Sequence, residues 1–145
     1  MKLLVLLLLG TILATPVHAQ EAPDNSQSRD STYEISLREP PEIDTQTVHY
    51  YYNFGRTALN RLKGVSFTLR NTGNLPLYFN DFDIHGSGFG YEENCPRLLF
   101  SGQRCTVRVF FRPTSLGTYS GALDIDMTGA EDIRIHLRGR GVWPY

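Results

Sequence analysis

The chain has 145 residues, of which 14 are Lys or Arg and 15 are Asp or Glu, so its net charge at pH 7 is −1. This length is enough for one domain and too short for two comfortable ones. The near-neutral charge argues against a general nucleic-acid binder, which normally carries a strong basic excess.

The first 19 residues have the pattern of a secretory signal peptide. One basic residue, Lys2, precedes an apolar run over residues 3–13, and a Val-His-Ala sequence places small residues where signal peptidase reads them. The run is shorter than the roughly 20 apolar residues that span a membrane. We therefore expect cleavage before Gln20, a periplasmic or secreted protein, and no stable membrane insertion after cleavage.

Residues 20–46 are predicted to be a polar N-terminal tether. Over residues 20–32 nearly every side chain is polar, so this part cannot bury a face. Tyr33, Ile35 and Leu37 then alternate with polar residues, which predicts a short edge strand or an arm docked on a sheet edge.

Residues 47–142 are predicted to form one domain, and together with the possible strand at 33–37 the chain has about seven short strands. Alternating apolar and polar residues, separated by turn signals, mark strands at 47–54, 65–70, 77–84, 105–112, 119–127 and 133–140. We expect Gly55 to end the first of these, a β-bulge near Asp81, where the alternation breaks, and a glycine-rich loop around Phe89. No segment after the signal peptide shows a helical period, so the predicted fold class is an all-β, immunoglobulin-like antiparallel sandwich.

Two details of the last strands can also be predicted. Tyr119 follows a long turn, and its hydroxyl is expected to bond to nearby backbone, as in the tyrosine corner of immunoglobulin-like sandwiches. The final hairpin turn, if centred on Ala130, sets the cross-strand register. The facing pairs would then be Asp126 with Arg134 and Asp124 with His136, each worth about 0–1 kcal/mol.

The two cysteines are predicted to form a disulfide. An exported chain folds in an oxidising compartment. Cys95 and Cys105 are separated by nine residues, whereas a catalytic or metal-binding pair more often has Cys-x-x-Cys spacing. Closing so short a loop contributes roughly 2–3 kcal/mol in the chain-entropy model. We expect a covalent clamp on the loop before the 105–112 strand.

No catalytic site, metal site or cofactor is predicted. His49, His85 and His136 lie on separate elements without the spacing of a zinc site, and there is no Gly-x-Ser-x-Gly elbow. A calcium site is the weaker alternative, because the acidic residues around the glycine-rich loop lack the core of a calcium loop. These residues are Asp81, Asp83, Glu92 and Glu93.

Outward-facing aromatic and arginine residues are the candidate interaction surface, because Tyr and Arg most often anchor interfaces. They include the aromatic C-terminal tail, residues 143–145. The candidates are Tyr51, Arg108, Phe110, Arg112, Trp143 and Tyr145. The alternative interpretation is that these are scattered surface residues and that the tail packs over a sandwich edge.

The stretch from Phe54 to Val142 also carries the motifs of a known domain type. The most specific are Asn71-Thr72-Gly73 and Phe111-x-Pro113, and others are Val65-x-Phe67-x-Leu69, Gly102-x-x-Cys105, Gly117-x-Tyr119-x-Gly121 and Leu137-x-Gly139-x-Gly141. With these motifs the chain resembles the abnormal-spindle/Hydin-like (ASH) immunoglobulin-like domain, in the cysteine-bearing form of exported bacterial "choice-of-anchor D" proteins. The resemblance implies a seven-stranded sandwich, related to major sperm protein and PapD-type chaperones, that serves as an interaction or scaffold module and not as an enzyme.

Two functions from different classes follow. The first is an exported adaptor that binds another protein of the envelope or extracellular space through a sheet edge or its Arg/Tyr face, since open edges accept added strands. The alternative is a module that binds carbohydrate or an envelope polymer, with Tyr51, Trp143 and Tyr145 as stacking platforms. Binding of nucleic acid is not expected.

Overall fold

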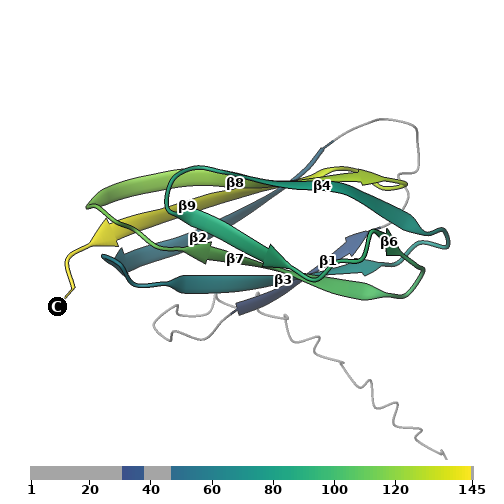
Figure 1. Cartoon of the computed structure of the whole chain (residues 1–145), viewed down its shortest axis with the longest axis horizontal. Helices are drawn as coiled ribbons and strands as arrows, with labels where there is room; N and C mark the ends of the chain where they lie inside the picture. The colour runs from purple at the N-terminus through teal and green to yellow at the C-terminus, as the bar shows by residue number, and fades with distance from the viewer. Residues whose placement is uncertain (1–30, 38–46, 145) are drawn as a thin grey trace, which may run out of the picture.

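The computed structural model describes residues 31–37 and 47–144. The predicted signal peptide, most of the predicted tether and Tyr145 lie outside the described residues. Within the described part, nine strands form two sheets that face each other as a sandwich (Figure 1). No helix long and apolar enough to cross a membrane occurs among these residues.

One sheet has four strands in the order β1-β3-β7-β5. Their bounds are Ser31–Leu37 for β1, Lys63–Asn71 for β3, Arg104–Phe111 for β7 and Phe89–Glu93 for β5. β3 and β5 both run antiparallel to β7, whereas β1 runs parallel to β3 at the sheet edge.

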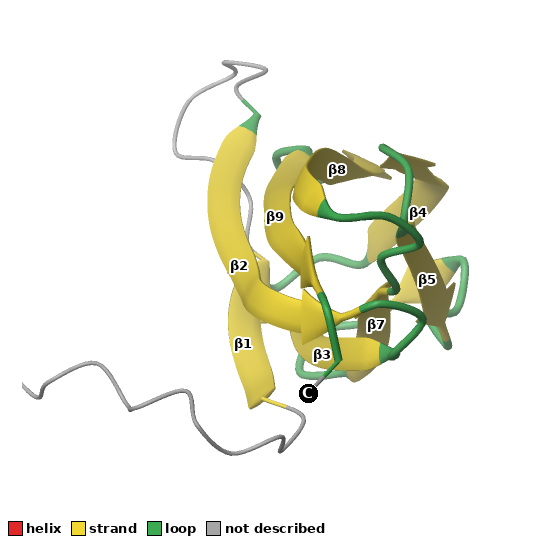
Figure 2. Cartoon of the chain, turned by 90° about the vertical axis from the view of Figure 1, so that its left-hand side faces the viewer, coloured by secondary structure: helices red, strands yellow, loops and turns green. Residues whose placement is uncertain are grey.

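The other sheet has five strands in the order β2-β9-β8-β4-β6. Their bounds are Val48–Ala58 for β2, Ile133–Val142 for β9, Gly117–Thr128 for β8, Leu77–His85 for β4 and Leu98–Leu99 for β6. The strands pair antiparallel except β2, which runs parallel to β9. The edge strands β1 and β2 lie on the same side of the sandwich (Figure 2), where the rings of Tyr33 and Tyr52 meet at 5.7 Å.

The core lies between the two sheets and follows from the alternation of the strands. Every second residue of β3, β7 and β9 is buried. Fully burying one such side chain contributes about 1.5–3 kcal/mol. The largest fully buried side chains include Phe54, Leu69, Leu77, Phe111, Leu123, Ile125, Ile135 and Leu137.

The all-β, immunoglobulin-like fold class is confirmed, but the number and direction of strands differ from the prediction. β5 and the two-residue β6 lie in segments that were predicted to be loops. Glycines interrupt the alternation in and before β5, and β6 is too short to show any alternation. The sandwich is also not wholly antiparallel, since β1 and β2 are both parallel to their neighbours. Alternation reports which face a residue occupies and carries no information on strand direction.

The prediction that Gly55 ends a strand is wrong, because β2 continues to Ala58. The register against β9 shifts between Asn53 and Arg56, and Gly55 adopts a φ of 68°. This is a β-bulge that uses the positive φ accessible to glycine. Phe54 is buried before the bulge and Thr57 is buried after it, so the bulge changes which alternate residues of β2 face the core. The bulge predicted near Asp81 is confirmed by a register shift in β4.

The predicted register of the last hairpin is wrong by two residues. Asp124 lies opposite Arg134, and Ala122 lies opposite His136. The turn centres on Gly129, whose φ is 95°, and not on Ala130. The loop closes where Asp132 accepts a hydrogen bond from the backbone N–H of Met127 at 2.9 Å.

The Asn-Thr-Gly motif ties three parts of the chain together. The buried amide of Asn71 donates to the carbonyl oxygens of Leu75 at 2.8 Å and Leu99 at 3.0 Å, and its Oδ1 accepts from Gly73 N–H at 3.0 Å. Thr72 donates to the carbonyl oxygen of Leu37 at the end of β1 through its backbone N–H and its hydroxyl. The motif therefore fixes the turn after β3, the loop containing β6, and the edge strand β1.

Two further predictions for the loops are confirmed. Cys95 and Cys105 form a disulfide that clamps the loop preceding β7. The Tyr119 hydroxyl accepts a hydrogen bond from Ser115 N–H at 2.9 Å and donates to the Ser115 carbonyl at 3.1 Å, as in a tyrosine corner. The hydrogen bond between the Ser115 and Tyr119 hydroxyl groups, at 2.9 Å, is the main reason that the pKa of Tyr119 is lowered, and the bond from the Ser115 backbone N–H adds to it.

Candidate functional site

The predicted interaction residues are distributed over three surfaces. Tyr51 lies on the outer face of the five-stranded sheet, and Arg108 and Phe110 lie on the outer face of the four-stranded sheet. Arg112 directly follows β7 and Trp143 directly follows β9, and these two strand ends lie at the same end of the sandwich, where residues 59 and 60 bond to the Val142 and Pro113 carbonyls. They therefore do not form a single surface, and each surface has its own chemistry.

The outer face of β2, β9 and β8 has a shallow depression of about 490 Å³. We call it the Tyr51 depression. β9 lies between β2 and β8, and β8 contributes small residues here beside the larger side chains of β9 and β2. Its lining residues include Tyr51 and Asn53 from β2, Ser120 and Gly121 from β8, and His136 and Arg138 from β9.

An aromatic stack forms one wall of the Tyr51 depression. The Tyr51 ring lies against the His136 ring at 4.7 Å with an interplanar angle of 12°. Nε2 of His136 is in turn 2.9 Å from Nδ1 of His49, so one imidazole donates a hydrogen bond to the other. Tyr51 nevertheless remains 78% exposed. The stack holds this ring in place before any ligand binds, which lowers the entropy lost on binding.

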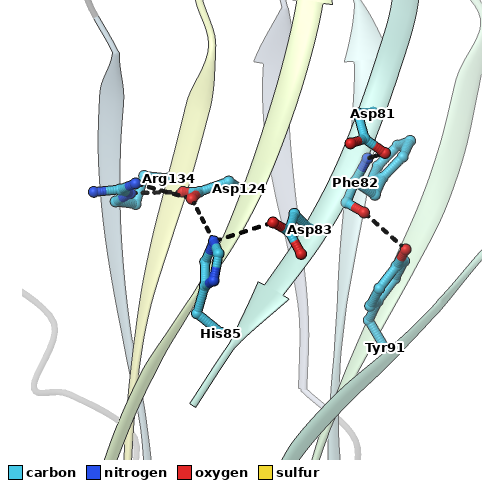
Figure 3. A network of polar contacts seen from close by, with 7 residues as sticks. All are labelled: Asp81, Phe82, Asp83, His85, Tyr91, Asp124 and Arg134. Atoms are coloured by element: carbon cyan, nitrogen blue, oxygen red, sulfur yellow. Dashed lines mark hydrogen bonds and ion pairs between the residues drawn. The ribbon is translucent and has the colours of Figure 1, made fainter.

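A polar network lies on the same sheet face (Figure 3). Asp124 accepts two hydrogen bonds from the Arg134 guanidinium, at 2.6 Å from Nε and 2.9 Å from a terminal nitrogen. His85 approaches Asp124 at 3.1 Å and Asp83 at 3.4 Å. The hydrogen bonds from Arg134 are the main reason that the pKa of Asp124 is lowered. This network links β4, β8 and β9 beside the depression.

The acidic residues considered for calcium do not converge. Asp81 accepts a hydrogen bond from the backbone N–H of its neighbour Phe82 at 2.9 Å (Figure 3). Glu93 accepts one from the backbone N–H of Cys95. Among the described residues, no group of three His, Cys, Asp or Glu side chains is placed to hold a metal ion.

On the four-stranded sheet, Arg108 and Phe110 contact each other. The Arg108 guanidinium carbon lies 4.8 Å from the centre of the Phe110 ring, which is a cation–π contact. Phe110 lies opposite Gly64 on β3 and Gly90 on β5. Its cross-strand neighbours therefore offer no side chains, and Arg108 provides the ring's contact along β7.

Two of these features depend on contacts between strands that are far apart in the sequence. The contact of His49 with His136 joins residues 87 positions apart, and only the parallel pairing of β2 with β9 brings them together. The Tyr51 depression likewise depends on which strand neighbours β2. A hint was present in the Ser-Gly-Ala stretch at 120–122, because small outward residues on a strand leave room beside large ones.

Residues 46–140 match the family model described as the HYDIN/CFA65/VesB-like immunoglobulin-like domain. The chain belongs to this family. The match spans well over half of the chain and runs from the start of β2 to within two residues of the end of β9.

Solved structures with this fold come from very different proteins. The ASH/PapD-like domain 7 of human CEP192 is 13% identical, with a TM-score of 0.50, and the match covers 91% of this chain and 99% of that one. The secreted serine protease VesC from Vibrio cholerae is 16% identical over 61% of this chain, with a TM-score of 0.50. The Vibrio cholerae VesB protease is 18% identical over 63%, with a TM-score of 0.51.

These likenesses concern the fold alone, given their low identity. The matched region spans only 21% of the VesC chain and 30% of the VesB chain. No curated protein sequence matches this family member. Immunoglobulin-like and PapD-like domains are generally non-catalytic and generally mediate protein–protein interaction.

Proposed function

We propose that this family member is an exported, non-catalytic module that binds another protein of the envelope or extracellular space at the Tyr51 depression and along the β2 edge. The observation that carries the proposal is the position of Tyr51. Its ring is held against His136, is 78% exposed, and stands on an edge strand beside Arg138. Tyr and Arg in a preformed recess are the residues that most often anchor a protein interface.

The edge position of β2 supports the same proposal. In the described sheets β2 pairs with β9 on one side and with no strand on the other. An edge strand of 11 residues can accept an extended segment of a partner through its backbone. The bulge at Gly55 interrupts this edge, so we expect the added segment to follow residues 48–53.

Three observations support export and a non-catalytic role. The Cys95–Cys105 disulfide is the kind of bond that persists in an oxidising compartment. The first 19 residues have the signal-peptide pattern. The family's immunoglobulin-like domain type is generally a binding module.

A carbohydrate or envelope-polymer ligand is the second candidate. It is favoured by one observation: the exposed Tyr51 ring is flanked by Asn53, Ser120 and Arg138, which can hydrogen-bond to hydroxyl groups. An exposed ring with polar neighbours suits a sugar as well as a peptide side chain.

Affinity capture with matched variants tests the proposal. The purified protein and its Tyr51→Ala, Arg138→Ala and Tyr78→Ala variants would be used to capture partners from envelope extracts. Tyr78 is the control, because it is a 49% exposed tyrosine on the same sheet face but on β4. We expect a protein partner that is lost with Tyr51→Ala and Arg138→Ala and retained with Tyr78→Ala.

A parallel pull-down with cell-wall and outer-envelope polysaccharides separates the two candidates. Saturable glycan binding that is lost with Tyr51→Ala would replace the protein ligand by a carbohydrate. A protein partner that all three variants retain would show that the depression is not the binding surface.

A further inference from the structure

One end of the sandwich is formed by four segments without acidic residues, and three of the four contain basic residues. These segments are residues 55–63, 86–90, 111–118 and 139–144. We call this surface the basic end. Its positively charged residues are Arg56, Arg61, Lys63, Arg112 and Arg140.

The backbone holds the four segments of the basic end together, as the view onto this end shows (Figure 2). Three hydrogen bonds of 2.8–3.0 Å join them pairwise. They run from Leu59 N–H to the Val142 carbonyl, from Asn60 N–H to the Pro113 carbonyl, and from Arg112 N–H to the Gly88 carbonyl. The charges therefore stand on a fixed frame although they lie far apart in the sequence.

The arginines of the basic end face solvent. Arg56 lies opposite Arg140 in the parallel register of β2 and β9, and both are exposed, as are Arg61 and Arg112. Lys63 differs, because its ammonium group donates to the Phe54 carbonyl at 2.7 Å and its burial lowers its pKa. Like charges on neighbouring strands disfavour the folded state slightly, so their gathering here is not explained by stability.

Apolar side chains stand among these arginines. Trp143 is 66% exposed and Leu62 is 59% exposed. Both line a groove of about 810 Å³ together with Arg56, Arg61 and Pro144. The groove therefore combines a large aromatic side chain and an aliphatic one with guanidinium groups at its rim.

We propose that the basic end is a second interaction surface, distinct from the Tyr51 depression, which binds an acidic segment of a partner protein. Carboxylates of the segment pair with Arg56, Arg61 and Arg140, because a guanidinium binds a carboxylate through two parallel hydrogen bonds. An apolar side chain between those carboxylates packs against Trp143 and Leu62. Charge complementarity brings the segment to the surface, and the apolar contact gives it specificity.

A polypeptide suits this surface better than a nucleic acid or a sulfated polymer. A polyanion needs only a series of cations along its backbone, whereas this groove also offers exposed apolar side chains, Trp143 and Leu62. The whole chain has a net charge of −1, without the overall basic excess of a nucleic-acid binder. The combination of local positive charge and apolar surface favours alternating acidic and apolar side chains.

Fluorescence anisotropy tests the proposal with the purified protein and a labelled peptide of repeated Glu-Glu-Leu units. Trp143→Ala and the double change Arg61→Glu with Arg140→Glu should each weaken binding tenfold or more. The matched control is Arg97→Glu with Arg104→Glu, which makes the same change of charge at exposed arginines outside the basic end. We expect the control to bind within twofold of the unchanged protein.

Several results would overturn the proposal. An equal loss in the Arg97→Glu, Arg104→Glu control would mean that net charge alone drives binding. Heparin or single-stranded DNA that binds as tightly as the peptide, with Trp143→Ala having no effect, would identify a polyanion site. Sedimentation that shows self-association lost with Arg61→Glu and Arg140→Glu would identify a second copy of this chain as the occupant.

The Tyr51→Ala variant separates this surface from the one proposed above. It should bind the acidic peptide as the unchanged protein does, whatever happens to its partner at the Tyr51 depression. Loss of peptide binding in Tyr51→Ala would mean that the peptide binds at the Tyr51 depression, and it would overturn the assignment to the basic end.

Discussion

The ring of Phe111 occupies the space that a side chain at Gly139 would need. A Cβ built on Gly139 would lie 2.4 Å from Cε1 and 2.6 Å from Cζ of Phe111. Phe111 is fully buried and touches the rings of Phe54, Phe89 and Tyr119, so it has little room to move. We predict that Gly139→Ala lowers the free energy of unfolding by about 1–3 kcal/mol or more, as overpacking does.

Gly90→Ala is the matched control for this prediction, measured by urea unfolding. A Cβ at Gly90 would meet no atom within 4 Å, and its φ is not positive. We expect a change of less than about 1 kcal/mol, or a slight gain, because alanine restricts the unfolded chain. Equal losses in the two variants would show that the contact with Phe111 does not decide the outcome.

Tyr119→Phe removes the hydroxyl that the turn after β7 is built around. That oxygen is hydrogen-bonded to the backbone of Ser115 and accepts from Thr114 N–H at 3.2 Å. Each lost hydrogen bond of this kind costs about 0.5–1.5 kcal/mol, so we expect a loss of about 1–2 kcal/mol in denaturant unfolding with an unchanged slope. Tyr78→Phe, at an exposed tyrosine on β4, should change the stability by less than about 0.5 kcal/mol.

Tyr119 also shows why part of the structure could be predicted from the sequence. Its position after a long turn, the alternation of β3, β7 and β9, and the close spacing of Cys95 and Cys105 are all local patterns. Each depends on neighbours within about ten residues, so the sequence alone was enough to anticipate them.

Features that depend on strand neighbours could not be predicted in this way. Alternation does not reveal that β2 lies beside β9, and so it could not reveal the Tyr51 depression or the gathering of Arg56 with Arg140. The hairpin register failed for a related reason, because Gly129 and the Asp132 side chain, rather than Ala130, determine where the turn is centred. The two interruptions of the alternation differ, because the bulge near Asp81 could be predicted from the break in the pattern, whereas Gly55 was interpreted as the end of a strand and is a bulge within β2.

Asn71→Ala should be among the most damaging single substitutions. The Asn71 side chain is fully buried, and its three hydrogen bonds satisfy the backbone groups of Leu75, Leu99 and Gly73. At about 1 kcal/mol each, with a further cost for leaving buried backbone groups unsatisfied, we predict a loss of about 3 kcal/mol or more. Thermal unfolding of the Asn71→Ala variant and the unchanged protein measures this loss of stability.

Thr72→Val is the companion variant for Asn71. It removes only the 3.1 Å hydroxyl bond to the Leu37 carbonyl, while the backbone N–H bond to the same oxygen remains. A loss near 1 kcal/mol is expected. A Thr72→Val loss as large as that of Asn71→Ala would contradict the central role assigned to the amide.

The contact of Asp124 with Arg134 should make part of the stability depend on pH. Because the pKa of Asp124 is lowered in the folded protein, the contact stabilises the fold above the unfolded-state pKa of about 3.9. This contribution is lost as the pH falls through the lower, folded-state pKa. It should be about 1 kcal/mol or less, since both side chains are partly exposed.

Arg134→Gln tests this pH dependence by urea unfolding between pH 7 and pH 2. The difference from the unchanged protein should be constant at neutral pH and shrink toward zero in acid. Arg70→Gln, which removes a single 3.9 Å approach to Glu34, should show a smaller difference throughout. A difference that stays constant down to pH 2 would mean that Arg134 acts through packing and not through the Asp124 carboxylate.

The parallel pairing of β2 with β9 has a consequence for how the molecule assembles. Val48 pairs with Ile133 and Ala58 with Val142, so the strand carrying Tyr51 must wait for a partner made about 85 residues later. β8 likewise obtains its neighbour on that side only when β9 is complete. Closing loops of this size is slow compared with forming local hairpins. While residues 133–142 are still being synthesised, β2 and β8 therefore lack the strand that lies between them, and the Tyr51 depression cannot form until β9 is in place.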